Sequence, residues 1–247
     1  MDAFFHPEPD GTLVATPWTR GPWDVRTQHG GPPSALLARA IDAAVGDERD
    51  AWIPARTIVE LLKPVPVSYT HLRAHATLEQ DGVVVARARA ILVRAIPEDA
   101  SLARAEDDRL PPPETWPPLE LAFFPHPVGY HRAIELRMEG AWPRARARVW
   151  SRMRVPLVLG EEPSGWERAL TFADAAHGLA PALDPTRYTI VNPDLELSLT
   201  RRPAGEWIAL DVTTETTAIG TGITRSRAHD RGGEVGACSA ALIVRPR

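Results

Sequence analysis

The segment Gln28-His29-Gly30-Gly31-Pro32-Pro33 could stabilise developing negative charge. It precedes a stretch with helical spacing, and prolines are tolerated in the first turn of a helix. A helix N-terminus presents unpaired N–H groups and about half a positive charge, and glycines let a ligand carbonyl approach the backbone closely. His29, Gly30 and Gly31 are therefore candidates for an oxyanion hole. The alternative is a glycine turn that enters an ordinary helix, with His29 as a structural cap.

A second candidate is Asp194, within Tyr188-Thr189-Ile190-Val191-Asn192-Pro193-Asp194-Leu195. Leucines alternate along the run that follows, at 195, 197 and 199, which predicts a strand with Asp194 on the face opposite to them. An acid at the beginning of a strand could orient or deprotonate a water molecule. The alternative is a turn residue or a strand cap.

A third candidate is the hydroxyl cluster Thr213-Thr214-Glu215-Thr216-Thr217. Threonine is also a good strand residue, so a structural role is favoured unless another observation selects one of the threonines.

Other chemistries have little support in the sequence. His71 and His75 lie on one face of an expected strand without a nearby third ligand, so we expect no metal site. Asp174 and His177 are three residues apart in an expected helix, and we interpret them as an exposed pair near its C-terminus. The chain contains no Gly-x-Ser-x-Gly elbow, P-loop or dinucleotide fingerprint.

The first half of the chain predicts one helix followed by strands. After Pro33, apolar residues recur at helical spacing at 36, 37, 40, 41, 44 and 45, which requires a surface against which this stripe is buried. Strand-like runs follow at residues 56–62, 70–79 and 83–94, and Gln80-Asp81-Gly82 is a hairpin signal between the last two.

The second half repeats this order. Residues 145–155 alternate as a half-exposed strand does, and Ser164-Gly165-Trp166-Glu167 is a capping box that opens a helix ending at Gly178. Strand-like runs follow at residues 188–200, 207–217, 222–228 and 236–244. One helix with an antiparallel meander, occurring twice, predicts an α+β architecture in which both sheets share a core.

Eight of the 25 prolines fall between Pro97 and Pro127, and they divide the halves. Because proline fixes φ and removes a backbone donor, this segment predicts a stiff, extended connector.

Length and charge narrow the class of protein. A chain of 247 residues is long enough for a large core, and its net charge of −4 offers no basic field for nucleic acid. The single cysteine, Cys238, excludes an intramolecular disulfide and fits a reducing compartment. With no membrane-spanning apolar run and no signal-peptide pattern at its start, we expect a cytoplasmic protein. Exposed edge strands favour a homo-oligomer.

Two groups of motifs carry a resemblance to a known family. They are Gly21-Pro22-Trp23-Asp24 through His29-Gly30-Gly31, and Asn192-Pro193-Asp194-Leu195 through Arg201 and Gly205-Glu206-Trp207. In these motifs and their order the chain resembles the acyl-CoA thioesterase II-like family (thioesterase-like superfamily). The resemblance implies a double hotdog fold, in which two fused units each wrap a curved antiparallel sheet around a long helix. It implies an N-terminal unit at 1–97, a connector at 98–129 and a C-terminal unit at 130–247.

The resemblance also implies a reaction. Family members hydrolyse acyl-CoA in fatty acid metabolism without a metal or other cofactor, using an Asp, a Thr or Ser, and a Gln to hold the attacking water. By position the Asp corresponds to Asp194, and the hydroxyl residue falls near Glu215, with Thr214 and Thr216 beside it. The Gln falls at Ala240. The expected partner is therefore a small acyl thioester bound near Gly30 and Gly31.

Ala240 departs from the family in a way that matters for activity. Alanine cannot hydrogen-bond a water, and loss of one such catalytic hydrogen bond costs about 10²–10³ in rate. Ser239 is expected to point to the opposite strand face. The alternative function is therefore a non-catalytic acyl-thioester-binding protein.

Two further comparisons with hotdog proteins are informative. A hotdog dehydratase is disfavoured because Asn192-Pro193-Asp194 is not followed by the histidine of the dehydratase motif. Residues 67–75 also do not match the family's pattern, which leaves the first half one strand short.

Overall fold

The computed structural model describes residues 2–22, 24, 26–62, 71–73, 77–80, 82–95, 97, 108–121, 124 and 126–247. Its helical elements are η1 (Pro17–Thr19), α1 (Gly31–Val45), η2 (Gly46–Ala51), η4 (Pro113–Thr115), α2 (Tyr130–Ala133), α3 (Gly165–Ala173) and α4 (Ala176–Leu179). The strands of the first half are β1 (Phe5–Pro7), β2 (Leu13–Ala15), β3 (Trp52–Leu61), β4 (His71–Arg73), β5 (Thr77–Gln80) and β6 (Val83–Arg94). Those of the second half are β7 (Ile134–Met138), β8 (Arg146–Met153), β9 (Tyr188–Val191), β10 (Asp194–Leu199), β11 (Trp207–Thr216), β12 (Thr221–Asp230) and β13 (Gly233–Pro246).

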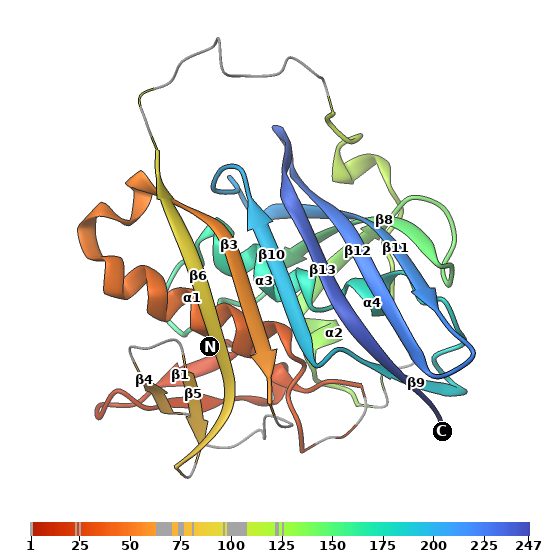
Figure 1. Ribbon diagram of the computed structural model, residues 1–247, viewed down its shortest axis with the longest axis horizontal. Coiled ribbons are helices and arrows are strands. Elements are labelled where there is room, and N and C mark those ends of the chain that lie inside the picture. Colours follow the sequence, from red (N-terminus) through yellow and green to blue (C-terminus); the bar gives the residue numbers. More distant parts are fainter. Residues whose placement is uncertain are drawn as a thin grey trace.

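The strands of the two halves join in one antiparallel sheet. Its order is β4-β5-β6-β3-β10-β13-β12-β11-β8-β7, and β9 pairs with β13 beside this path. The junction is the pair β3–β10, in which Val59 lies opposite Leu195 and Glu60 opposite Asp194. Figure 1 shows α1 and α3 behind this sheet, where they pack against each other. The shared core that the sequence predicts is therefore enclosed by a single continuous sheet.

Helix α1 begins where its sequence predicts. Gly30 is its N-cap, Pro32 and Pro33 occupy the first turn, and Gly46 ends the helix with a φ of 74°. Only a residue that tolerates positive φ closes a helix in this way, and glycine does so without steric cost. Leu36 and Leu37 are fully buried, so the apolar stripe faces the core.

Helix α3 starts at the predicted capping box but ends earlier than expected. The Ser164 hydroxyl accepts from the Glu167 amide, and the Glu167 carboxylate accepts from the Ser164 amide. The helix stops at Ala173, Asp174 is its C-cap, and a separate turn, α4, contains Gly178. The expectation of one helix ending at Gly178 is wrong, because the chain breaks at Asp174.

The remaining strand predictions hold with local changes. Strand β6 matches the expected run, and the expected strand at 188–200 is divided by Asn192-Pro193 into β9 and β10. The connector contains one short helical turn, η4, and Trp116 after it lies 6.4 Å, between ring centroids, from Trp150. Most of residues 67–75, His75 included, lie outside the described residues, as does the side chain of His71.

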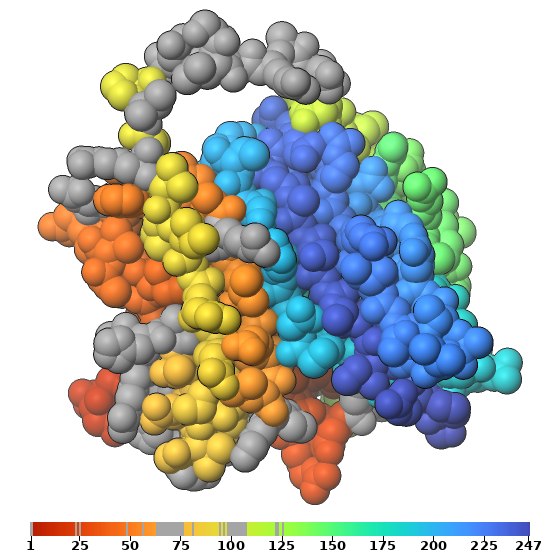
Figure 2. Space-filling view, in the orientation of Figure 1, coloured from red at the N-terminus to blue at the C-terminus, as the bar shows by residue number. Residues whose placement is uncertain are grey.

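A row of polar side chains lies on the outer face of the sheet. Along β10, the residues Asp194, Glu196 and Ser198 are half-buried while the alternating leucines are buried against the helices. Figure 2 shows this face, on which β6, β3, β10, β13 and β12 follow one another from yellow to blue. Among the described helices, α1 is the longest at 15 residues, and none is long and apolar enough to cross a membrane.

Candidate active site

A cavity of about 460 Å³ opens at the N-terminus of α1, where the two halves of the chain meet. Leucines and a phenylalanine form much of its wall, from both halves and the connector: Leu61, Leu62, Leu121, Phe124 and Leu179. Polar groups gather at one end, where His29, Asp174 and Asn192 line it. Small-molecule sites are typically of this kind, with volumes of about 300–1,000 Å³, mostly apolar walls and a few convergent polar groups.

His29, Asp174 and Asn192 form a chain of contacts across the join between the halves. His29 Nδ1 lies 2.9 Å from Asp174 Oδ2, and Asn192 Nδ2 donates to Asp174 Oδ1 at 2.8 Å. The His29 side chain is 11% exposed and that of Asp174 only 4%. Each carboxylate oxygen of Asp174 thus has its own partner.

Tyr130 fixes the plane of the His29 ring. The two rings stack with centroids 3.7 Å apart and planes 4° apart. The Tyr130 hydroxyl donates to the Thr171 carbonyl of α3 at 2.8 Å. Burial raises the pKa of Tyr130 well above its usual range, and the nearby Asp174 charge adds to this, so the phenol stays neutral and keeps its hydrogen bond.

Gly30 and Gly31 are glycines because two side chains and a neighbouring backbone come too close for a Cβ atom. A Cβ on Gly30 would lie 2.6 Å from Asp174 Oδ1, and one on Gly31 would lie 2.3 Å from the Thr171 carbonyl oxygen. Pro32 and Pro33 have no N–H, and the Ser34 amide already donates to Gly30. The other amides at the start of α1 are those of Gly30 and Gly31, and the Gly31 amide donates to His29 Nδ1 at 3.1 Å.

Asp174 and His177, two of the ionisable groups that line the cavity, have shifted pKa values. Burial pushes the pKa of Asp174 upward, but the charge and hydrogen bond of His29 and the hydrogen bond from Asn192 outweigh it, so the net pKa is lowered. Asp174 is therefore ionised at neutral pH. Burial lowers the pKa of His177 to about 4 despite the opposing charge of Asp174, so His177 is neutral there.

The expectation that Asp174 and His177 form an exposed pair is wrong. Asp174 is 3% exposed and His177 9% exposed, and both line the cavity. The break between α3 and α4 turns this segment inward at the contact with α1.

Asp194 does not line this cavity. Its Oδ1 accepts from the Ala241 amide of the neighbouring strand at 2.9 Å, on the outer face of the sheet. The prediction that Asp194 lies opposite to the alternating leucines is confirmed.

Thr214 and Ala240 lie on the helix-facing side of the sheet instead. Thr214 pairs with Thr224 across β11 and β12, and their hydroxyls are 3.2 Å apart; Thr224 in turn lies opposite Ala240. All three side chains are buried. Thr216, two residues along β11, is half-buried opposite Gly222. The structure thus places His29 and Gly30 in the wall of the cavity, with the Gly31 amide bonded to His29, and leaves Asp194, Thr214, Thr216 and Ala240 outside that wall.

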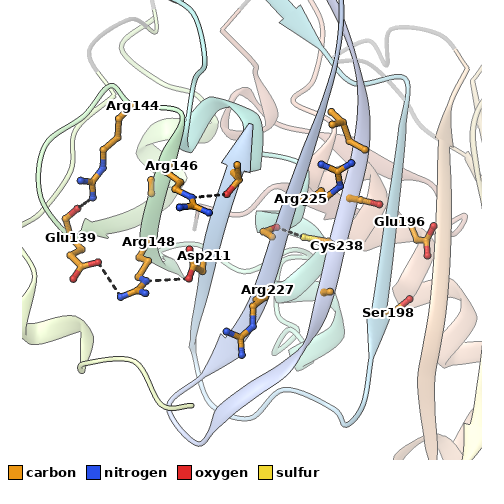
Figure 3. A pocket seen from close by; sticks show the side chains of 16 residues that line it. Glu139, Arg144, Arg146, Arg148, Glu196, Ser198, Asp211, Arg225, Arg227 and Cys238 are labelled. Carbon is orange, nitrogen blue, oxygen red and sulfur yellow. Dashed lines mark hydrogen bonds and ion pairs between the residues drawn. The ribbon is translucent and has the colours of Figure 1, made fainter. Parts of the chain in front are cut away.

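A second, shallower depression of about 900 Å³ crosses the outer face of the sheet. Figure 3 shows Arg148 between two acids: it donates to Asp211 at 3.1 Å and lies 3.5 Å from Glu139, while Arg146 donates to the Thr213 hydroxyl. Cys238 at its floor is buried, and burial raises its pKa to about 11 although Ser226 hydrogen-bonds it. A neutral thiol and paired charges provide no nucleophile there.

One group in the described part of the chain has the spacing of metal ligands, namely Asp108, His229 and Glu234. Arg227 Nε already donates to Glu234 at 2.7 Å, and Arg227 also lies 4.0 Å from Asp108. Both acids of this group thus already have a guanidinium as an ion-pair partner.

Comparison with known families decides the classification. The model of the acyl-CoA thioesterase C-terminal domain matches residues 99–244, and that of the acyl-CoA thioesterase N-terminal domain matches residues 19–93. The chain belongs to the acyl-CoA thioesterase family. A search of curated protein sequences finds no significant match.

Solved structures of similar fold cover almost the entire chain. A hotdog-fold protein of unknown function from Alicyclobacillus acidocaldarius has a TM-score of 0.68 and 14% identity, covering 95% of this chain and 92% of its own. The acyl-CoA thioesterase II TesB2 of Mycobacterium marinum has a TM-score of 0.62 and 15% identity, with coverage of 88% and 90%. The tesB protein of Mycobacterium avium subs paratuberculosis has a TM-score of 0.64 and 14% identity, with coverage of 95% and 93%. The α+β double hotdog fold is thereby confirmed.

Sequence reasoning missed three members of this site: Asp174, Asn192 and Tyr130. Asn192 lies within Asn192-Pro193-Asp194, one of the motifs that carry the family resemblance. That position was the available signal. No signal in the sequence marks Tyr130, because its role is defined by stacking on His29, which lies 101 positions earlier.

Proposed function

We propose that this protein hydrolyses acyl-CoA thioesters, with the acyl chain in the cavity at the start of α1 and the thioester carbonyl at the amides of Gly30 and Gly31. The observation that carries the proposal is the apolar-walled cavity that Gly30 lines at the start of α1, with Gly31 next along the helix. The positive end of a 15-residue helix favours an oxyanion there. Membership of the acyl-CoA thioesterase family supports the same substrate class.

The test is hydrolysis of a panel of acyl-CoA esters of increasing chain length, followed by detection of the free thiol. We expect turnover that depends on chain length, because the leucine-lined wall has a fixed volume. The variant Leu62→Trp fills the cavity and is expected to lower kcat/KM at least tenfold for the longer substrates. Ile219→Trp is the matched control, since Ile219 is 83% exposed and does not line the cavity.

A second candidate function is acyl-thioester binding without turnover, and Ala240 favours it. Calorimetric binding of a panel member with no release of thiol supports this candidate. Turnover produced by Ala240→Gln identifies an enzyme that has lost a catalytic group. Absence of both binding and turnover contradicts both candidates.

The role of Asp194 as the residue that activates water, with Thr214 or Thr216 beside it, stays a prediction. Its carboxylate is held by the Ala241 amide on the outer face of the sheet. Asp194→Asn tests it directly, and unchanged turnover in this variant rejects the role.

A further inference from the structure

We propose that Asp108, His229 and Glu234 bind a divalent metal ion of the Zn²⁺ type, which ties the connector to the C-terminal unit. Each of the three side chains offers one ligand atom, and these atoms all lie within 4.8 Å of one another. None of the three residues lines the cavity at the start of α1. The proposed ion is therefore structural, and this inference is independent of the proposed hydrolysis.

Two of the ligands come from one hairpin. His229 on β12 lies directly opposite Glu234 on β13, and the register of the two strands shifts between Ala228 and His229. Directly opposite residues on neighbouring strands have Cβ atoms about 4.5–5.5 Å apart and interact on one face of the sheet. An irregularity of the register re-aims a side chain. The hairpin thus brings an imidazole and a carboxylate together where its two strands meet.

The third ligand reaches this hairpin from the connector. Asp108 Oδ1 accepts the Glu234 backbone amide at 3.1 Å, and a Cβ on Gly233 would lie only 2.5 Å from the same oxygen. Gly233 has a φ of 120°, which favours glycine. Figure 1 shows the chain after residue 108 beside the joined ends of β12 and β13, at the top of the view. The hairpin turn therefore has room for the Asp108 carboxylate because residue 233 has no side chain.

The His229 side chain is the observation that points to a ligand. His229 is 1% exposed, and its Nδ1 has no hydrogen-bond partner among the described residues. His229 lies in one cross-strand row with Ala209 and Trp150, and the Trp150 indole donates to the Pro111 carbonyl of the connector. The connector thus covers this end of the sheet. A buried polar atom without a partner is costly, and imidazole is the commonest metal ligand in proteins.

Arg227 leaves each acid an oxygen for a metal. Both of its hydrogen bonds to Glu234 go to Oε2, so Oε1 accepts none from the described residues. Arg227 lies 4.0 Å from Asp108 Oδ2, which is longer than a hydrogen bond. The Arg227 side chain is 56% exposed, so its guanidinium can turn toward solvent. A metal ion competes with this guanidinium for the acids but displaces no buried contact of it.

The three donors favour a metal of intermediate softness. Imidazole nitrogen suits Zn²⁺, whereas Ca²⁺ and Mg²⁺ take oxygen ligands. Three protein ligands with water in the remaining position is a common arrangement for Zn²⁺. Ligand atoms at about 2.0–2.2 Å from Zn²⁺ lie at most about 4.4 Å apart, so the group has to close by only about half an ångström. Asp108 and Glu234 are half-buried and can make this movement.

The test is calorimetric titration of the chelator-treated full chain with ZnCl₂. We expect one Zn²⁺ per chain and a rise in Tm with Zn²⁺ concentration, because a ligand that binds only the folded state stabilises it. His229→Gln is expected to weaken binding by more than the roughly 10–100-fold that loss of a group outside the coordination sphere costs. His6→Gln is the matched control: His6 also has a buried nitrogen without a partner among the described residues, but it is not in a group with metal-ligand spacing.

Two variants of exposed or half-buried side chains test the site even if His229→Gln does not fold. Glu234→Gln is expected to weaken Zn²⁺ binding as His229→Gln does. Arg227→Met is expected to tighten it about tenfold, because it removes a positive charge beside the ion. A group that merely needs a cation for its acids shows no such gain for Zn²⁺ over Ca²⁺.

Three results overturn the proposal. The first is a Zn²⁺ affinity that is unchanged in both His229→Gln and Glu234→Gln, which places any bound metal elsewhere. The second is an equal response to CaCl₂ and ZnCl₂, which excludes the imidazole as a ligand. The third is no binding of Zn²⁺ to either the wild type or Arg227→Met. All three are read from metal binding, so they hold whether or not acyl-CoA is hydrolysed.

Discussion

Two glycines set the distance between the helices that bear the site. The Cα of Gly31 faces the Thr171 carbonyl, and that carbonyl also accepts the Tyr130 hydroxyl that keeps the His29 ring in place. A Cβ atom added at residue 31 would therefore disturb both the contact between α1 and α3 and the position of the His29 imidazole. The absence of a Cβ here is a requirement of packing, since the helical φ and ψ at this position are open to any residue.

We predict that Gly31→Ala destabilises the protein by about 1–3 kcal/mol, because overpacking a close contact forces the backbone to shift. A Cβ only 2.3 Å from the Thr171 oxygen has to move α1 away from α3. Urea denaturation measures the loss. Gly178→Ala is the control, since a Cβ there meets no atom within 4 Å, and an equal loss in both variants contradicts the prediction.

At the residue scale the sequence identifies half of the site. His29, Gly30 and Gly31 could be found because a Gly-Gly-Pro-Pro helix start has a local chemical meaning. Asp174 could not, because an Asp and a His three residues apart at a helix end are equally consistent with a solvent-facing pair. Burial of Asp174 depends on the break after Ala173 and on the approach of α1, and both are tertiary properties.

At the scale of elements, α3 is held by a capping box whose acid is buried. Glu167 is 7% exposed, and its carboxylate accepts the Ser164 amide while Asp42 lies nearby. Burial raises the pKa of Glu167 from 4.5 to about 7; the Ser164 hydrogen bonds oppose this shift and the Asp42 charge adds to it. The helix start is thus formed by a group that is costly to ionise.

This shift predicts that Glu167 makes the protein less stable as the pH rises. Because the folded pKa lies above the unfolded one, the protonated form binds the folded state better, and its contribution is complete below about pH 4.5 and lost as the pH rises through about 7. A shift of this size corresponds to about 3 kcal/mol. We expect Glu167→Gln to match the wild type near pH 4.5 and to exceed it by up to that amount at pH 8.

Urea denaturation of both proteins at pH 4.5 and pH 8 measures this difference, and comparison with the wild type at each pH cancels the other titrating groups. Glu139→Gln is the control, because the Glu139 side chain is 46% exposed and lies at the surface. A stability difference for Glu167→Gln that is the same at both pH values contradicts the prediction.

The sequence predicts an element correctly where the alternation of side chains lies within that one element. It fails where the chain changes direction. Strand β6 has the predicted bounds because alternation over twelve residues is a property of the strand itself. Residues 188–200 are divided into β9 and β10 because the two parts pair with different strands. Strand β9 pairs with β13, while β10 lies between β13 and β3. Pro193 marks the division, but the sequence alone does not show which strand pairs with which.

At the scale of the whole molecule, the two halves are joined by more than the β3–β10 pair. Arg202, which follows β10, reaches across to α1 and binds both oxygens of Asp42, at 2.8 and 3.0 Å. Its Nε also donates to the Trp52 carbonyl at the start of β3. These side chains are 16% and 4% exposed, so this is a largely desolvated, bidentate ion pair between the halves.

We predict that Arg202→Met lowers the free energy of unfolding by about 3–5 kcal/mol, because it leaves the Asp42 carboxylate buried without a partner. The double variant Arg202→Met/Asp42→Leu is expected to lose less than the single one, since it removes the orphaned charge. Arg231→Met is the control: Arg231 and its partner Glu114 are both exposed, and such pairs contribute at most about 1 kcal/mol.

The shape of the unfolding curve tests the larger claim that the fused units form one cooperative structure. One sheet runs through both halves, α1 packs against α3, and the core cluster includes residues of each. Tryptophan fluorescence and far-ultraviolet circular dichroism are therefore expected to report a single, coincident transition in the wild type. In Arg202→Met the transition is expected to move to lower urea while staying single, because the β3–β10 ladder still couples the halves. Two separate transitions in the wild type would mean that each hotdog unit is stable alone, and the cavity at the start of α1 would then depend on docking of the units rather than on folding.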